Sequence, residues 1–273
     1  MTLQILSLGA GVQSSILALM SEFGELPRLD AAIFADTGAE PAEVYEWLDW
    51  IKKKVSFPVF TVAHGDLTAD AVETRISKRS GNRYCRNTIP VFTRGASEQG
   101  SGKMPRTCTA NYKINPIRKK VRTLLKESGE NRADQWIGIS TDEVHRMKDS
   151  QVNFIDNIYP LVNLNMSRND CLTWATSNGI KRPPRSACVY CPFHSDKEWI
   201  RIKNEDPQGW NKSVQFEKDL QKGFAEVSDA WKDPSDPPIP FLHKDRIPLD
   251  QVEFDAENQL DLFGEECEGM CGL

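Results

Sequence analysis

Residues 5–20 read ILSLGAGVQSSILALM, and this stretch decides the fold. The apolar run at its start predicts a buried strand, the glycines and serines predict a tight turn, and the apolar residues at its end have helical spacing. The backbone N–H groups of such a turn face open space, and the dipole of the following helix adds positive potential. The stretch therefore predicts a strand, a turn and a helix N-terminus that bind an anion, most often a phosphate.

A second strand is predicted at residues 31–35, and the polar segment DTGAEP follows it. Polar groups at the carboxyl ends of two early strands mark the usual ligand crevice of an α/β sheet. Apolar periodicity predicts further strands and helices in alternation, with helices at 42–55, 114–126 and 167–174, strands at 58–62 and 135–139, and a short extended piece at 158–161. Such alternation is typical of a parallel twisted sheet with helices on both faces, so we expect an α/β fold.

Two segments lack this pattern. Residues 66–102 show weak periodicity, and we expect a long active-site loop with one or two short helices. Residues 233–240 read DPSDPPIP and predict a connector to a C-terminal extension that bears cysteines. We therefore expect a nucleotide-binding domain at 1–195 and a helical, proline-rich extension at 196–273 that packs back on the site.

Composition limits the possible functions. The 273 residues carry a net charge of −5, which argues against a protein that binds polyanions with its whole surface. The apolar runs are too short for a membrane span and the N-terminus has no leader pattern, so we expect a cytoplasmic protein with no membrane partner. Seven cysteines in such a chain indicate metal or redox chemistry more than disulfides.

The first turn resembles the PP-loop of the ATP pyrophosphatase superfamily, Ser-Gly-Gly-X-Asp-Ser, with Gly9 in place of the first Ser and Gln13 in place of Asp. The DTG segment resembles that of the phosphoadenosine phosphosulfate (PAPS) reductase branch. The resemblance implies a Rossmann-like fold of the adenine nucleotide alpha hydrolase type. It also implies that ATP or PAPS is bound by Gly9, Ala10, Gly11, Gln13, Ser14, Ser15, Asp36, Thr37, Gly38, Arg106, Gly138 and Arg146.

Two later motifs extend the resemblance over residues 3–195. RTCT at 106–109, with Lys113, is similar to a segment of sulfonucleotide reductases and DNA phosphorothioation enzymes. GISTDE at 138–143, with Arg146, is similar to a further segment of the same enzymes, although Ser140 stands where that segment has an Arg. On their own chemistry, Lys113 and the arginines could neutralise phosphates, and Asp142 with Glu143 could hold Mg²⁺; a solvated charged loop is the alternative.

The cysteines form the other strong signal. Cys188 and Cys191 lie in a Cys-X-X-Cys turn that can hold one metal or cluster. Candidates for the remaining ligands are Cys108, Cys267 and Cys271. In the resembling reductases and thiolases, a cysteine at the position of Cys108 joins the pair on a [4Fe–4S] cluster; zinc is the alternative.

Three other side chains near these motifs are open to two interpretations. We expect Cys171 to be a core residue and His194 to make a polar contact rather than bind a metal. Cys85 lies beside Arg83 and Arg86, so it is either a thiol with a lowered pKa or an ordinary surface thiol.

Basic residues cluster in two runs. Each run is either a charged face or a groove for a nucleic-acid backbone. The runs consist of Arg75, Lys78, Arg79, Arg83 and Arg86, and of Lys181, Arg182 and Arg185.

Three functions fit these features. In the first, the enzyme uses ATP, releases AMP and pyrophosphate, and transfers sulfur to a tRNA, a DNA or a small molecule, with Lys113 and Asp142 in the reaction and a sulfur donor as partner. In the second, it resembles a PAPS or adenosine phosphosulfate reductase, in which Cys267 attacks sulfur and a thioredoxin-like reductant releases sulfite. The third is a nucleotide-binding regulator without turnover. The acidic neighbours of Cys267 would raise its pKa. We prefer the first, and a homodimer is among the open assembly states.

Overall fold

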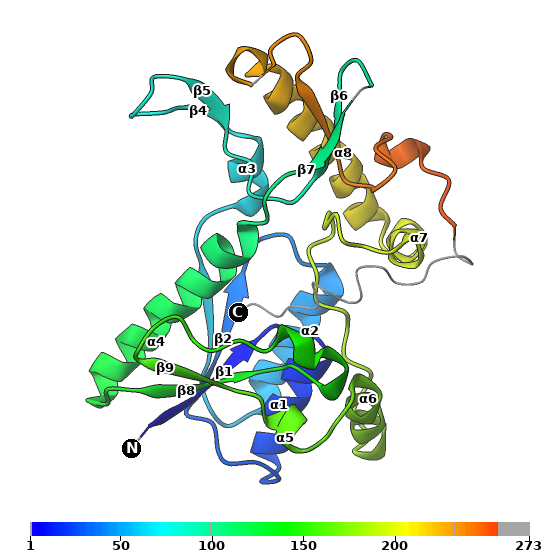
Figure 1. The fold of residues 1–273 in the computed structure, drawn as a ribbon. Coiled ribbons are helices and arrows are strands. Elements are labelled where there is room, and N and C mark those ends of the chain that lie inside the picture. Colours follow the sequence, from blue (N-terminus) through cyan, green and yellow to red (C-terminus); the bar gives the residue numbers. More distant parts are fainter. Residues whose placement is uncertain (1, 99, 232, 256–273) are drawn as a thin grey trace. The chain divides into compact units, whose positions relative to one another are not determined.

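The structure is a computed structural model that describes residues 2–98, 100–231 and 233–255 (Figure 1). The described chain forms two compact units. The first comprises residues 2–64 and 109–187, and the second comprises residues 65–108 and 188–255. These units are compact parts of the fold, whereas the division expected at residue 195 concerns function, so that division stays a prediction.

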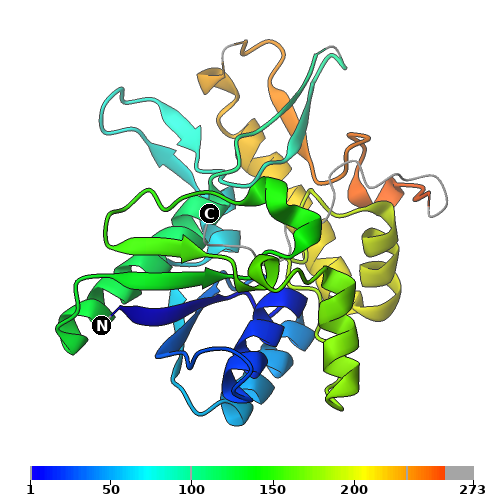
Figure 2. The same ribbon diagram turned by 60° about the horizontal axis from the view of Figure 1, so that its bottom comes forward.

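The first unit is built on a parallel sheet with the strand order β3-β2-β1-β8-β9. The strands are β1 (Leu3–Leu8), β2 (Ala31–Asp36), β3 (Val59–Ala63), β8 (Ala133–Ile137) and β9 (Ile155–Ile158). Figure 2 shows β1, in dark blue, beside the green strands β8 and β9. The helices of this unit are α1 (Val12–Glu22), α2 (Ala42–Lys54), η1 (Thr109–Ile114), α4 (Asn115–Ser128), η2 (Thr141–Arg146), α5 (Pro160–Asn163) and α6 (Arg168–Ser177).

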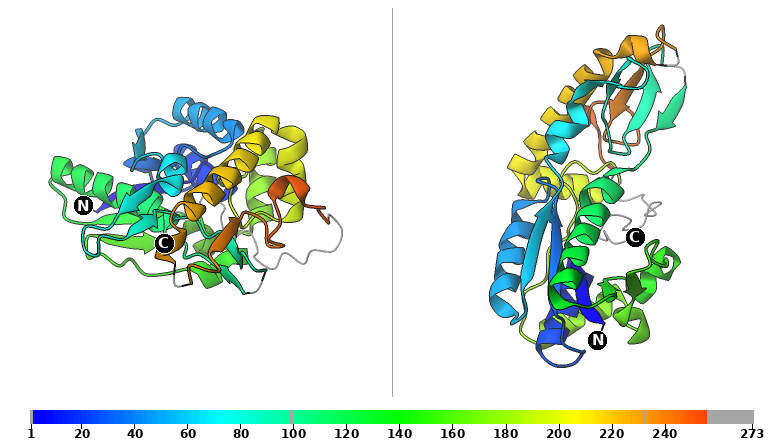
Figure 3. Two further views of the ribbon diagram at one scale, coloured as in Figure 1. Left: turned by 90° about the horizontal axis from the view of Figure 1, so that it is seen from above. Right: turned by 90° about the vertical axis from the view of Figure 1, so that its left-hand side faces the viewer.

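Alternate residues of the strands pack on opposite faces of this sheet, as the period of two requires. Leu6 and Phe34 belong to a core cluster that includes buried residues of α1, α2 and α6. Ile5 and Ile33 belong to a second cluster with Ile117 and other residues of α4. In the right-hand view of Figure 3, α2 in light blue and α4 in green lie on opposite sides of the strands. The predicted fold class, a parallel α/β sheet covered on both faces, is confirmed.

The second unit consists of short antiparallel strands and helices. The strands β4 (Thr74–Ile76) and β5 (Arg83–Cys85) form one hairpin. The strands β6 (Phe92–Gly95), β7 (Ser101–Lys103) and β10 (Pro238–Phe241) form a sheet in the order β10-β6-β7. The helices are α3 (Leu67–Val72), α7 (Asp196–Glu205), α8 (Pro207–Ala225), η3 (Ser228–Ala230) and η4 (Leu249–Gln251).

Three sequence predictions about local structure are wrong. The expected loop at 66–102 contains α3 and four strands, because β6 pairs with the distant β10 and β4 pairs with β5. The expected connector at 233–240 supplies β10 itself. The expected extended piece at 158–161 ends at Ile158, because Pro160 begins α5, where its missing N–H costs no hydrogen bond.

Within the part of the chain that the structure describes, none of the helices has the length and apolar character that crossing a membrane requires.

Candidate functional site

The strand order of the first unit reverses between β1 and β8, and ligands of open α/β sheets bind at the carboxyl ends of the strands at such a point. The chain leaves β1 through Gly9 and enters α1, and it leaves β8 through Gly138. These two exits touch: a Cβ added to Gly138 would lie 2.8 Å from the backbone nitrogen of Ser14. The end of β8 is therefore packed against the first turn of α1, and only glycine fits there.

The turn before α1 has an unusual backbone. Ala10 has a φ of +57°, a left-handed conformation that L residues other than glycine adopt at a cost. Gly11, the N-cap, is extended, and within the described residues no side chain caps α1. The first turn of α1 also has no acidic residue. The positive end of α1 is thus not neutralised by its own side chains, which suits an anion.

The serine hydroxyls of this turn have structural partners. Ser14 Oγ accepts a hydrogen bond from the Gly9 N–H at 3.1 Å, which closes the turn. Ser15 Oγ accepts one from Trp47 Nε1 at 2.9 Å and is fully buried. Because both hydroxyls act as acceptors in these contacts, their own hydrogens can still be donated, and the backbone amides of the turn are further donors suited to phosphate.

Gln13 lies in a buried network instead of facing the turn. Its Nε2 donates to Glu143 Oε2 at 3.1 Å and lies 3.5 Å from Ser140 Oγ. Its Oε1 accepts from Arg168 Nη1 at 3.4 Å. A neutral amide can donate to the carboxylate and accept from the guanidinium at once, whereas an Asp at this position would place two negative charges side by side.

The two acidic residues of the GISTDE motif have different surroundings. Glu143 is buried, and its Oε1 lies 2.6 Å from Arg146 Nη1. Asp142 is exposed, and its Oδ2 accepts from the Arg168 N–H at 2.6 Å and from Ser140 Oγ at 3.4 Å. Asp142 Oδ1 makes no hydrogen bond with the described residues, so Asp142 is the better fit for a Mg²⁺ ligand.

The end of β2 is ordered by its own polar groups. Asp36 Oδ1 accepts from the Gly38 N–H and from the Tyr45 hydroxyl, both at 2.8 Å. Burial, followed by the hydrogen bond to Asp36, raises the pKa of Tyr45 well above its usual value. Thr37 Oγ1 accepts from the Ala39 N–H at 3.3 Å, and Thr37 is buried. The DTG segment is therefore a rigid turn at the carboxyl edge of the sheet.

Lys113 lies on η1, a π-helical turn that precedes α4; such turns are frequent at functional sites. Its Nζ lies 3.1 Å from Glu40 Oε1, and the side chain of Glu40 is 1% exposed. Glu40 Oε2 accepts from Ser186 Oγ at 3.4 Å, and a Cβ on Gly11 would lie 3.3 Å from Ser186 Cβ. These contacts link Lys113 to the turn before α1. Neither Glu40 nor Arg168 had a predicted role; Glu40 lies in the polar segment after β2, and Arg168 lies in the first turn of a predicted helix.

The Cys-X-X-Cys turn of the second unit is closed by hydrogen bonds. The Cys191 N–H donates to the Cys188 carbonyl at 2.9 Å, and His194 Nε2 lies 2.9 Å from the same oxygen. The polar contact expected for His194 is thus present. Cys108 belongs to the same unit, where its N–H donates to the Thr88 carbonyl at 3.0 Å. Cys108, Cys188 and Cys191 are not in disulfides.

The described residues contain no group of three or more His, Cys, Asp or Glu that could hold a metal ion. The chemistry and spacing of Cys188 and Cys191 still suit two ligands from one turn. Cys267 and Cys271 lie outside the described residues.

Other predicted residues have these positions. Cys171 is fully buried, as expected, and burial raises its pKa to about 12. The lowered pKa considered for Cys85 is wrong, because burial raises it. Arg106 lies in the second unit, with its guanidinium 5.8 Å from the ring centre of Phe193.

Comparisons with known proteins give structural neighbours only. No protein-family model and no curated protein matches the chain. PAPS reductase from Candida auris, in a phosphate complex, is similar with a TM-score of 0.39 and 13% identity, over 67% of this chain and 76% of that one. The U34-tRNA thiolase NcsA from Methanococcus maripaludis, with its [4Fe–4S] cluster, is similar with a TM-score of 0.36 and 15% identity, over 80% of this chain and 72% of that one.

These two neighbours are of the same kinds as the enzymes that the sequence resemblance names. At TM-scores below 0.5 neither likeness is an argument for an activity. The strand order of this chain establishes the fold class, and a function has to be argued from the chain's own residues.

Proposed function

We propose that the protein binds an adenine nucleotide, ATP, with its phosphates at the N-terminus of α1. The observation that carries this proposal is the uncapped start of α1 at the point where the strand order reverses, packed against Gly138. The amides of Gly11 and the first turn of α1 would donate to phosphate oxygens, and the ordered DTG segment at the end of β2 would form the other side of the site.

Mg²⁺ would bind through Asp142, whose Oδ1 is available for a ligand bond. Glu143 has a different role in this proposal, because Gln13 and Arg146 both donate to it. Lys113 would neutralise phosphate charge, and its ion pair with Glu40 holds its ammonium in place when no nucleotide is bound. Arg106 is a further candidate for neutralising phosphate charge.

The reaction proposed is ATP-dependent sulfur transfer. An acceptor oxygen attacks the α-phosphorus of ATP, the bond to the β-phosphate breaks, and pyrophosphate leaves. Sulfide from a sulfur donor then displaces AMP from the acceptor. If the donor is instead a persulfide, its outer sulfur displaces AMP, and a second thiol cleaves the resulting disulfide, which leaves the thiolated acceptor and a disulfide of the two donor thiols. The acceptor class is a nucleic acid, tRNA or DNA, or a small molecule.

The cysteine centre would consist of Cys188 and Cys191 with Cys267 and Cys271, or with Cys108. A [4Fe–4S] cluster at this centre, when bound, would supply an iron able to bind sulfur; zinc is the alternative metal. The donor type supports this assignment, since two cysteines outside any disulfide lie in one Cys-X-X-Cys turn. Cys267 is also the candidate nucleophile.

The test separates nucleotides and products. Anaerobically purified protein should contain iron and sulfide, and ATP should raise its Tm because it binds only the folded state. With acceptor and sulfur donor present, it should release AMP and pyrophosphate. Sulfite release from PAPS with a dithiol would instead identify a sulfonucleotide reductase, and ATP binding without turnover across candidate acceptors would identify a regulator.

Cysteine variants assign the roles of the C-terminal thiols. If Cys267 and Cys271 are both ligands, Cys267→Ser and Cys271→Ser should each lose iron as well as activity. If Cys267 is a nucleophile, Cys267→Ser should keep its iron and its ATP affinity but lose turnover. Cys171→Ser is the matched control, since its thiol is in the core of the first unit.

A further inference from the structure

The hairpin formed by β4 and β5 is strongly basic in an acidic protein. Residues 73–86 contain five Lys or Arg and one carboxylate, Glu73, which gives this segment a charge of +4, whereas the whole chain has −5. Such a reversal of sign in a short segment marks a place where an anionic partner can bind.

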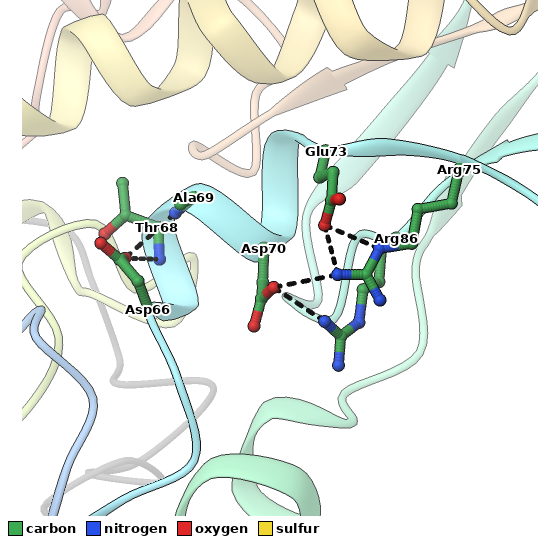
Figure 4. A network of polar contacts seen from close by, with 7 residues as sticks. All are labelled: Asp66, Thr68, Ala69, Asp70, Glu73, Arg75 and Arg86. Carbon is green, nitrogen blue, oxygen red and sulfur yellow. Dashed lines mark hydrogen bonds and ion pairs between the residues drawn. The ribbon is translucent and has the colours of Figure 1, made fainter.

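The base of this hairpin is held to α3 by ion pairs (Figure 4). Asp70 Oδ1 lies 2.7 Å from Arg86 Nη1 and 3.4 Å from Arg75 Nη2. Arg75 also pairs with Glu73, with its Nε 2.7 Å from Glu73 Oε2. The carboxylate of Asp66 caps α3 through the amides of Thr68 and Ala69. Arg75 and Arg86 therefore anchor the base of the hairpin to α3, and this anchoring holds the cations of the outer part in position.

The outer part of the hairpin presents its cations to solvent. A closed turn joins the strands, since the Ser77 N–H donates to the Asn82 carbonyl at 2.8 Å and Gly81 takes the left-handed φ of +73°. Lys78, Arg79 and Arg83 are exposed. In the described parts of the chain, no carboxylate pairs with any of these three cations.

Two large side chains are exposed among these cations. Ile76 is 69% exposed and Tyr84 is 42% exposed. The register pairs Ile76 with Arg83 and Tyr84 with Arg75, and paired residues project from the same face of a ladder. One face of the hairpin thus places Arg83 beside the apolar Ile76, and the other face places Arg75 beside the aromatic ring of Tyr84.

We propose that the β4–β5 hairpin is a docking site for a single-stranded segment of nucleic acid. Lys78, Arg79 and Arg83, which pair with no carboxylate of the described residues, suit consecutive phosphates. Tyr84 lies on the other face of this narrow ribbon from Arg83, so a flexible single strand that passes over the edge of the ribbon can also stack an unpaired base on its ring, which a duplex does not offer. The proposal does not depend on ATP binding, because every residue that carries it lies in the second unit. The competing occupant is the chain's own residues 256–273, which carry five carboxylates.

The experiment measures fluorescence anisotropy of a labelled 12-nucleotide single-stranded RNA with the full-length protein, without ATP, over a range of salt concentrations. The triple variant Lys78→Gln, Arg79→Gln, Arg83→Gln should bind about tenfold or more weakly at low salt. Its plot of log K against log salt should be shallower by about 2, since each phosphate contact on a single strand contributes about 0.7. Tyr84→Ala should weaken binding about tenfold, and Tyr84→Phe should not.

The matched control is Lys52→Gln, Lys53→Gln, Lys54→Gln on α2, which removes the same charge from exposed positions of the first unit. It should bind RNA as the wild type does, and circular dichroism should show both triple variants folded. Equal loss in the two triple variants, or tighter binding of a 12-base-pair duplex than of the single strand, would overturn the proposal. Binding that appears only after the acidic residues of 256–273 are replaced by amides would assign the hairpin to the chain's own C-terminus and would also overturn it.

Discussion

The N-termini of α1 and α6 are built in opposite ways. At α6, Ser167 Oγ accepts from the Asp170 N–H at 3.1 Å, and the Asp170 carboxylate accepts from the Ser167 N–H at 2.8 Å, which makes a capping box. These hydrogen bonds from Ser167 lower the pKa of Asp170. At α1, by contrast, the N-cap is a glycine, and the described chain supplies neither a capping side chain nor an acidic residue in the first turn.

The difference shows which helix end serves stability and which end is available to a ligand. A capping box satisfies the first amides of a helix and neutralises the positive end of its dipole. Within the described residues the start of α1 has no such side-chain acceptor, and the turn before it includes the strained Ala10. Local strain of this kind persists where the surrounding structure holds it and is common at functional sites.

The largest effect should come from Gly138→Ala. The new Cβ would lie 2.8 Å from Ser14 N and 3.1 Å from Ser14 Cα, so the first turn of α1 must move. We expect a loss of about 1–3 kcal/mol in the free energy of unfolding and loss of the rise in Tm caused by ATP. Differential scanning fluorimetry with and without ATP measures both.

Gly11→Ala is the control for Gly138→Ala. Its Cβ would lie 3.3 Å from Ser186 Cβ, 3.5 Å from Ser186 N and 3.9 Å from the Pro184 carbonyl oxygen, so a shift of a few tenths of an ångström at Ser186 can accommodate it. We expect Gly11→Ala to keep much of the ATP effect. A Gly138→Ala variant that retains the wild-type response to ATP would show that the start of α1 is not the phosphate site.

A smaller effect is expected from Gln13→Glu, which has nearly the same shape. It replaces the donor 3.1 Å from Glu143 by a carboxylate oxygen, and we expect a loss of about 1–2 kcal/mol at pH 7. The paired carboxylates should share a proton, which raises the pKa of one of them in the folded state. Protonation then favours the folded variant, so its deficit relative to wild type should shrink as the pH falls toward 5.

The double variant Gln13→Glu, Glu143→Gln tests the same pair. It restores one amide and one carboxylate, so we expect it to recover part of the stability and to lose the pH dependence, as urea unfolding at pH 5 and pH 7 would show. If the two changes were simply additive, the buried contact between these side chains would be refuted.

The smallest effect should come from Ser167→Ala at α6. Loss of the N-cap should cost about 1 kcal/mol, a decrease of roughly 2–4 °C in Tm, and should leave the ATP-induced rise unchanged. Because the folded-state pKa of Asp170 is lowered, its contribution is present above the pKa of the unfolded state and is lost as the pH falls through the folded-state value. The wild type and Asp170→Asn should therefore converge in stability in strong acid.

The two helices also show what the sequence could predict. The predicted helices at 42–55 and 167–174 are confirmed, because residues close in sequence specify them: the apolar stripe of α2 and the capping box of α6 are both local. The pairing of β6 with β10 joins residues more than 140 positions apart, and strands of three or four residues have too little periodicity to be recognised. The short strands of the second unit were therefore missed.

In the candidate site, too, local motifs could be predicted from the sequence and long-range contacts could not. The turn at Gly9–Gly11 and the DTG segment were predicted because each motif is local. The contact of Gln13 with Glu143 spans 130 positions, and that of Lys113 with Glu40 spans 73. No local pattern encodes which distant carboxylate such a side chain meets, so Gln13 was expected to bind phosphate and Glu40 received no role.

The most direct test of the nucleotide site follows the backbone amides of the two helix ends by ¹⁵N NMR during titration with Mg-ATP. We expect the amide signals of Val12, Gln13 and Ser14 to shift with ATP concentration and to saturate, while those of Asn169 and Asp170 in the capped first turn of α6 move much less. Equal small shifts at both helices, or larger shifts at α6 than at α1, would contradict the claim that α1 binds the phosphates.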